Sequence, residues 1–302
     1  MKREISKLCV LGMTALMVSS ILLPASAKAD SVEGEDNTKP YISLGADLKA
    51  NEKKTVLDIL GVEEDDLKDY TVVTITNADE HKYLDDYLSA SVIGSRALSS
   101  VLVEKEDKGE GIDVTTKNIT YCTPGMYENA LTTAGITDAD VKVAGPFRIS
   151  GTAALVGAMK AYEEMTGETI SKDSADAATN ELVVTSKLGD ELGDKDKAEK
   201  FVAMVKEKVL SDGTSSDEDI NQIIDDASKD LDVDLTDSQK EQIADLMKKI
   251  DRLDLSADQL KEQASKIYDE INKMDLGGKG GFGEVAKSIF QTIYDAIYSL
   301  FD

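Results

Sequence analysis

Residues 71–150 alternate between short apolar runs and helical patterns, and this alternation limits the available folds more than any other feature. Runs rich in β-branched residues predict strands, and capped runs with helical spacing predict helices. The expected strands are 71–76, 97–106, 112–120 and 140–145, and the expected helices lie near 79–89 and 124–135. The order strand, helix, strand, strand, helix, strand predicts an α+β fold with a ferredoxin-like βαββαβ sheet domain.

A weak internal repeat supports a pseudo-symmetric sheet. Six positions have similar residues 74 positions later. Each copy is predicted to run in the order helix, glycine stop, acidic turn and strand. They are Leu57, Leu60, Gly61, Val62, Asp66 and Leu67, matched by Leu131, Ala134, Gly135, Ile136, Asp140 and Val141. Gly109 and Gly111 tolerate positive φ and predict a hairpin turn within 105–111. The expected strand order is 4-1-3-2, with antiparallel neighbours.

The first 29 residues predict a secretory signal peptide. Lys2, Arg3 and Lys7 precede an apolar run over 8–23, and Ala-x-Ala cleavage motifs end at Ala27 and Ala29. The run is short for a membrane-spanning helix. We therefore expect a secreted protein associated with the cell envelope, in which residues 30–40 form a flexible tether.

The charge balance excludes several classes of partner. The chain has 59 acidic and 34 basic residues and a formal net charge of -25, so nucleic acid and anionic lipid are repelled. Tryptophan is absent, which disfavours a carbohydrate cleft built on stacked tryptophans. Cys9 leaves with the signal peptide, so Cys122 has no intramolecular disulfide partner.

The chain after the sheet region is predicted to be helical. Residues 41–192 form the α+β domain, in which 150–165 and 175–192 are helices, although 182–185 also fits a strand. The acidic region 193–276 contains four helical patterns: 198–210, 217–231, 236–253 and 256–274. Residues 277–302 combine a glycine hinge with an amphipathic tail helix. The tail suits docking on protein, with weak membrane-surface contact through 284–302 as the alternative.

One edge of the predicted sheet gathers residues suited to an anion. The predicted topology brings together the end of the third strand, the start of the second and the end of the fourth. The residues expected there are Arg96, Arg148, Tyr121, Thr123 and Ser150. Arginine binds carboxylate or phosphate bidentately, and helices starting after Thr123 and Ser150 offer free N–H groups. The alternative is that both arginines pair with acidic residues of this acidic chain.

A Cys–His pair is the second chemical hypothesis. His81 is the only histidine, and Cys122 is the only cysteine beyond the signal peptide. A thiolate nucleophile needs a base within hydrogen-bond reach. The predicted topology places these residues at opposite edges of the sheet. We therefore expect a surface or capping role for His81 and a buried Cys122.

An acidic stretch resembles a calcium-binding loop. Asp230, Asp232, Asp234 and Glu241 match the first, third, fifth and twelfth positions of an EF-hand. Leu235 occupies the position where that loop needs glycine. The alternative is a helix–loop–helix junction capped by Thr236, with Leu231, Val233 and Leu235 pointing inward.

Five segments carry a family resemblance across essentially all of the chain beyond the signal peptide. They are 44–48 (Leu-Gly-Ala-Asp-Leu), 77–81 (Asn-Ala-Asp-Glu-His), 93–100 (Ile-Gly-Ser-Arg-Ala-Leu-Ser-Ser), 118–122 (Asn-Ile-Thr-Tyr-Cys) and 150–155 (Ser-Gly-Thr-Ala-Ala-Leu). The chain resembles the YpuA-like family of exported Gram-positive bacterial proteins, a domain of unknown function. The resemblance implies export and carries no activity, fold or site.

These features favour interaction over catalysis. The sequence contains no Walker loop, HExxH, GxSxG, SxxK or CxxC motif, and no cofactor is expected. We expect a non-catalytic binding or structural protein at the cell envelope, with an unknown envelope protein or polymer as its partner. The alternative is an envelope enzyme or small-anion sensor that uses the edge with Arg96 and Arg148.

Overall fold

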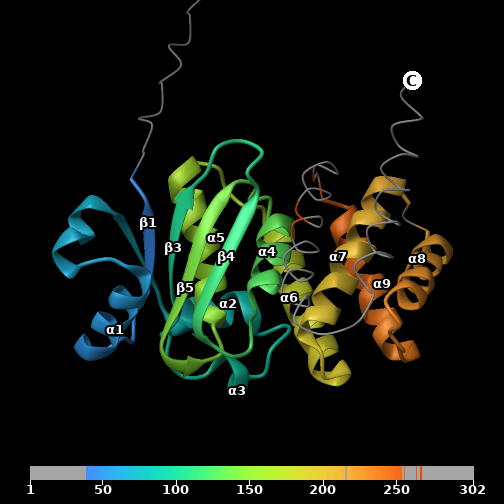
Figure 1. Cartoon of the computed structure of the whole chain (residues 1–302), viewed down its shortest axis with the longest axis horizontal. Helices are drawn as coiled ribbons and strands as arrows, with labels where there is room; N and C mark the ends of the chain where they lie inside the picture. Colours follow the sequence, from blue (N-terminus) through green and yellow to red (C-terminus); the bar gives the residue numbers. More distant parts are fainter. Residues whose placement is uncertain (1–38, 215, 254, 256–262, 264–265, 267–302) are drawn as a thin grey trace, which may run out of the picture. The chain divides into compact units, whose positions relative to one another are not determined.

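The computed structural model describes residues 39–214, 216–253, 255, 263 and 266. These residues form an α+β unit in which a five-stranded sheet is followed by helices (Figure 1). The expected signal peptide 1–29, most of the tether and the tail 277–302 lie outside the described residues. Within the described part of the chain, no helix is long and apolar enough to cross a membrane.

The strands form one sheet in the order β2-β1-β3-β5-β4. Their bounds are β1 Tyr41–Gly45, β2 Thr71–Ile75, β3 Ser100–Lys105, β4 Ile112–Ile119 and β5 Ala139–Ile149. β1 pairs in parallel with β2 and antiparallel with β3. β5 pairs antiparallel with β3 and in parallel with β4. Among the described strands, β3 therefore runs against the other four.

The four predicted strands are present as β2 to β5, but the ferredoxin-like order 4-1-3-2 is not confirmed. The sequence pattern missed β1, whose five residues are all buried. A strand buried along its whole length needs neighbours on both edges, and β1 lies between β2 and β3. β5 also presents apolar residues to both faces, with Val143 on one and Ala144 on the other, and takes a place between β3 and β4.

The connection between β3 and β4 is not the predicted hairpin. Gly109 and Gly111 do have positive φ angles, 94° and 72°. Their N–H groups donate to one carboxylate oxygen of Asp138, at 2.8 and 3.0 Å. Asp138 directly precedes β5, so this loop is fixed at the start of β5, and β4 pairs on the far side of that strand.

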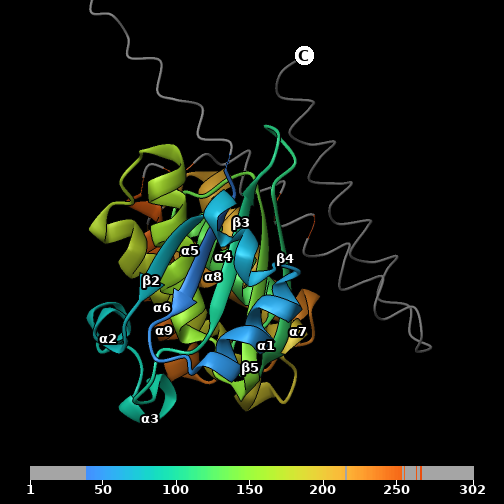
Figure 2. The same ribbon diagram turned by 90° about the vertical axis from the view of Figure 1, so that its left-hand side faces the viewer.

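Helices cover both faces of the sheet. α1 (Ala50–Leu60) packs on one face, and α4 (Pro124–Thr133) and α5 (Thr152–Thr166) pack on the other. In Figure 2, α1 lies in front of the sheet and the later helices lie behind it. The offset of 74 relates two parallel strand–helix–strand units, β1-α1-β2 and β4-α4-β5. The correspondence is partial, because Asp66 and Leu67 lie in a short 3-10 helix whereas Asp140 and Val141 lie in β5, and the two α-helices pack on opposite faces of the sheet.

A helical layer completes the described structure. Its members are α6 Lys172–Leu192, α7 Lys195–Asp212, α8 Asp217–Asp230 and α9 Asp237–Asp251. α6 serves two cores: Leu182 packs in the core against the sheet, and Leu188 packs in the core of the later helices. The alternative strand at 182–185 is therefore wrong. The short elements η1 (Glu64–Asp69), α2 (Asn77–Leu84) and α3 (Ala90–Ile93) lie in the connections before β3.

Candidate functional site

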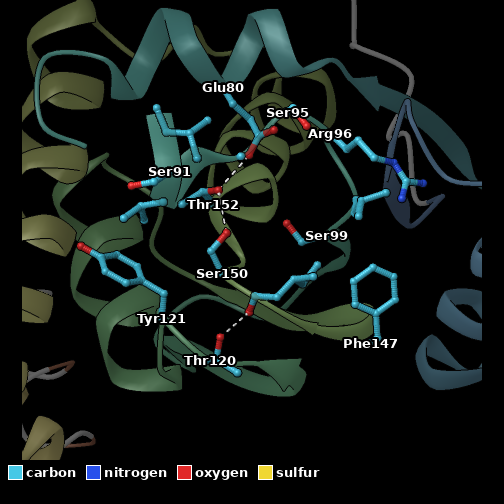
Figure 3. Close-up of a pocket in the computed structure, with 15 residues that line it drawn as sticks. Glu80, Ser91, Ser95, Arg96, Ser99, Thr120, Tyr121, Phe147, Ser150 and Thr152 are labelled. Atoms are coloured by element: carbon cyan, nitrogen blue, oxygen red, sulfur yellow. Dashed lines mark hydrogen bonds between the residues drawn. The ribbon is translucent and has the colours of Figure 1, made fainter. Parts of the chain in front are cut away.

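An open pocket of about 460 Å³ lies where β3 begins and where β4 and β5 end (Figure 3). Ser100 of β3 pairs with Ala144 of β5, and Ile119 of β4 pairs with Ile149 of β5. Because β3 runs against β4 and β5, its first residues meet the last residues of both. The pocket walls come from α2, from α3 and the loop that leads into β3, from the segment that follows β4, and from the end of β5 and the start of α5.

Glu80 forms the most buried polar part of the pocket wall. Its side chain is 1% exposed, and its carboxyl oxygens accept hydrogen bonds from the Thr152 hydroxyl at 2.8 Å and the Asn77 amide at 3.2 Å. The Thr152 and Ser150 hydroxyl oxygens lie 3.2 Å apart. Burial raises the pKa of Glu80, against the opposing effect of these hydrogen bonds. The wall is therefore a connected hydrogen-bond network that starts from a desolvated carboxyl.

Further hydroxyl groups hold the loops of the pocket in place. The Ser99 hydroxyl accepts a hydrogen bond from the Ala154 N–H at 2.9 Å, which ties the start of β3 to the first turn of α5. The Thr120 hydroxyl donates to the Ile149 carbonyl at 2.9 Å and joins the segments that follow β4 and β5. These two bonds connect segments far apart in the chain, so the pocket is built into the fold.

Three of the five predicted anion-site residues line this pocket: Arg96, Tyr121 and Ser150. Arg148 is exposed and is not among the lining residues. Thr123 caps α4 and faces α7, where its hydroxyl donates to Glu199. The ends of β4 and β5 lie at the same edge of the sheet as the start of β3, which brings Arg96, Tyr121 and Ser150 together, and anion binding at this edge stays a prediction.

Arg96 and the starts of α4 and α5 each lie against a glutamate of the chain. Arg96 donates to Glu52 of α1 at 2.5 Å and to the Asp47 carbonyl at 2.6 Å. Glu80 bonds the first residue of α5, and Glu199 lies against the first turn of α4. This arrangement matches the alternative in which Arg96 pairs with an acidic residue.

Among the carboxyl groups near this edge, Glu199 has the pKa that is shifted furthest from its ordinary value. It is 3% exposed, and burial raises its pKa to about 7, although the hydrogen bond from Thr123 acts in the opposite direction. Its carboxyl group fills the space where a side chain at Gly125 would lie. Glycine at this position therefore lets the carboxyl approach the N-terminus of α4, where backbone N–H groups stabilise negative charge.

His81 and Cys122 do not form a nucleophile–base pair. The predicted reason was wrong, because β2 and β4 run in the same direction and their ends share one edge. His81 instead lies 2.5 Å from Asp85, one turn along the chain. Cys122 is 2% exposed, and burial raises its thiol pKa to about 12. The expected buried Cys122 and surface His81 are therefore both found.

The calcium candidates do not assemble into a metal centre. Among the described residues, no group of three or more histidine, cysteine or carboxylate side chains is placed to hold a metal ion. Thr236 caps α9 through a capping box with Gln239. Leu231 and Val233 are buried, as the helix–loop–helix alternative requires. Asp230, Asp232, Asp234 and Glu241 thus belong to a helix junction.

Sequence reasoning missed three residues that shape the pocket: Glu80, Ser99 and Phe147. The position of Glu80 three residues after Asn77 was the available signal of a local hydrogen bond. Ser99 and Phe147 carry no local signal, because their roles depend on β3, β4 and β5 meeting. Phe147 is 47% exposed at the pocket rim (Figure 3).

Comparisons with known proteins place this fold and pocket in a family. The family model described as protein of unknown function (DUF1002) matches residues 44–267. The chain belongs to the DUF1002 family. It is similar to the uncharacterized protein YpuA of Bacillus subtilis strain 168, with 41% identity over 293 residues, 96% of this chain and 98% of that protein. No solved structure matches the present chain.

The region matched to DUF1002 contains every residue that lines the pocket. It also contains β3, β4, β5 and α5, which position those residues. The pocket is therefore a feature of the DUF1002 part of the chain, and its chemistry must be inferred from its own side chains.

Proposed function

We propose that this DUF1002 protein is an exported, non-catalytic binding protein that holds a small polar ligand in the pocket beside Glu80. The observation that carries the proposal is the pocket itself. It is open, and its wall joins Glu80, Thr152 and Ser150 in one hydrogen-bond network. Ligand sites typically combine an apolar lining with a few converging polar groups.

The state of the reactive side chains supports binding over catalysis. At neutral pH the Cys122 thiol stays protonated, because burial raises its pKa to about 12. A protonated, buried thiol is a poor nucleophile. His81 is engaged by Asp85 and does not line the pocket. The pocket hydroxyls therefore serve to hold a ligand in this proposal.

A blocked pocket tests this function. Ser95 lines the pocket and is exposed, so Ser95→Trp should fill the opening without disturbing the core. Ser238→Trp on the exposed face of α9 is the matched control. We expect compounds in a thermal-shift screen of small polar molecules to raise the Tm of the original chain and of the control, but not of Ser95→Trp. A screen in which all three proteins respond alike would contradict a pocket ligand.

The site of action is proposed to be the cell envelope. The proposed location rests on the signal-like residues 1–29. The proposed partner is an unidentified envelope protein or polymer, which binds through residues 277–302. The intact mass of the exported protein should correspond to cleavage after Ala27 or Ala29. Envelope proteins should be captured by the mature chain and lost when 282–302 are removed. Retention of residues 1–29 in the mature protein would remove this part of the proposal.

A small-anion sensor is the second candidate, because Arg96 lines the pocket together with Tyr121 and Ser150. An anion would have to displace Glu52 from Arg96. Replacing Arg96 and Arg148 together should then abolish any rise in Tm caused by inorganic phosphate. An undiminished rise would exclude the Arg96/Arg148 edge. An envelope enzyme at the same edge would form a product, and replacing Arg96 and Arg148 together should abolish that product.

A further inference from the structure

The charged groups around the pocket are balanced before any ligand enters. Arg96 is the only cationic side chain among the described lining residues, and its guanidinium points away from the pocket centre toward α1 (Figure 3). Glu52 and the Asp47 carbonyl accept its hydrogen bonds there. Glu80 is 1% exposed, and burial raises its pKa against the hydrogen bonds from Thr152 and Asn77. An entering anion would meet the Glu80 carboxyl and an arginine that is already paired with Glu52, whereas an uncharged ligand would not be repelled.

The polar groups that face the pocket are mainly hydroxyls. A hydroxyl both donates and accepts, so it matches ligand hydroxyls in either direction. The Ser99 oxygen accepts from the Ala154 N–H, which leaves the Ser99 proton as a donor for a ligand. Ser150 and Thr152 provide two more hydroxyls, 3.2 Å apart, beside Glu80. The pocket therefore offers both donors and acceptors within one wall.

The other side of the pocket is apolar and carries an aromatic ring. In Figure 3, Phe147 lies across the pocket from Glu80. Leu98 also lines the pocket, and Ile93 lines it while packing with Leu84 at the end of α2. An exposed aromatic ring offers a flat apolar surface with a partial negative charge on its face, which attracts the polarised C–H groups of a ligand. A ligand that fits must then have one apolar face and several hydroxyls, and a volume of about 460 Å³ suits a small molecule.

We propose that the pocket binds the ring of an uncharged sugar, with its hydroxyls on Glu80, Ser99 and Ser150 and its C–H face on Phe147. This inference rests on the proposed binding function and names its ligand class. The ring can belong to a free sugar or to the end of a glycan polymer, because the pocket is open on one side.

Isothermal titration of the purified protein with glucose, N-acetylglucosamine and inorganic phosphate tests the ligand class. We expect a sugar to bind and phosphate to give no signal. Phe147→Ala should weaken sugar binding about tenfold, the equivalent of one well-packed contact. Val72→Ala is the matched control, because Val72 is a large apolar residue with a similar exposure of 45% on β2. Retention on insoluble chitin without binding of free rings would assign the site to polymer ends.

Glu80 supplies a second test that separates its chemistry from its structural role. Glu80→Gln keeps the side-chain shape and one acceptor, so we expect sugar affinity within about threefold of the original, whereas Glu80→Ala should lose about tenfold. If phosphate binds and sugars do not, and Arg96→Gln abolishes the phosphate binding, the sugar inference is overturned. The proposed binding function would then still stand. Absence of sugar binding together with a negative Ser95→Trp screen would overturn both.

Discussion

The carboxylate of Glu199 on α7 accepts a hydrogen bond from Thr123, the residue that caps α4. The two residues are 76 positions apart in the sequence. Their contact joins the helical layer to the sheet half of the fold beside the pocket segment that follows β4. The same carboxyl has a pKa raised by burial to about 7, so this junction changes charge near neutral pH.

Stability should fall with rising pH because of Glu199. In the unfolded chain this carboxyl loses its proton near pH 4.5, and in the folded chain near pH 7. The folded state thus binds more protons between these values, so the stabilisation is complete below pH 4.5 and is lost as pH rises to 7. The loss should be about 3 kcal/mol. Urea unfolding at pH 4.5 and pH 7.5 would measure it. Glu199→Gln should remove this part of the pH dependence, and exposed Glu218→Gln should not.

A buried ion pair should be costly to break from one side. Lys206 of α7 lies 2.8 Å from Glu181 of α6, and both side chains are almost fully buried. Burial lowers the pKa of Lys206 and raises that of Glu181, and the attraction between the two groups opposes both shifts. Lys206→Met should reduce the free energy of unfolding by about 3–5 kcal/mol.

The paired change Lys206→Met with Glu181→Leu should be less destabilising than Lys206→Met alone, because no buried charge is left without a partner. Chemical unfolding of both variants would measure the difference. Lys229→Met breaks the exposed pair with Asp226 and should change little. Equal losses for the exposed and the buried lysine would argue against the burial of Lys206.

Gln263 should protect the exposed edge of β4. Its side-chain amide donates to the Ile112 carbonyl at 2.9 Å and accepts from the Ile112 N–H at 2.8 Å, as a neighbouring strand would. Gln263→Ala should speed hydrogen exchange of the Ile112 amide by about tenfold or more, because both bonds are lost. Gln263→Glu should have an intermediate effect. Gln242→Ala on α9 is the exposed control, and an unchanged Ile112 rate would rule out this edge contact.

Cys122 should be unreactive in the folded protein. In a chain that begins at residue 30, it is the only cysteine. Its pKa of about 12, against an ordinary value of 9.0, implies roughly a thousandfold smaller thiolate fraction at pH 8. Iodoacetamide should therefore modify it only after urea unfolding. Ser211→Cys adds an exposed thiol as the positive control. Rapid modification of native Cys122 would reopen the case for a nucleophile.

Local features of the fold could be predicted from the sequence. The four strands β2 to β5 follow their apolar runs, and Thr123 and Thr236 both accept the capping hydrogen bond expected of a helix start. These signals depend on neighbours within a few residues. The helix–loop–helix character of the acidic stretch was predictable for the same reason.

Strand order and site partners could not be predicted, because they depend on residues far apart. β1 is only five residues long and lies next to a polar segment, so its pattern carries little weight. Because β1 was missed, the predicted sheet placed β2 inside the sheet, whereas it lies at an edge, and gave β4 the wrong direction. The partner of Arg96 is Glu52, 44 residues earlier, and many other acidic residues had equal claim in the sequence.

The internal position of β1, between β2 and β3, also has a consequence for how the chain assembles. β1 is made before every other strand, yet Tyr41 pairs with Val103, about 60 residues later. Until β3 has been synthesised, β1 exposes a hydrogen-bonding edge and two apolar faces. Closing so long a loop is slow compared with forming a helix. A nascent chain therefore passes through a stage at which its first strand can pair with another molecule, and this stage ends only when β3 arrives.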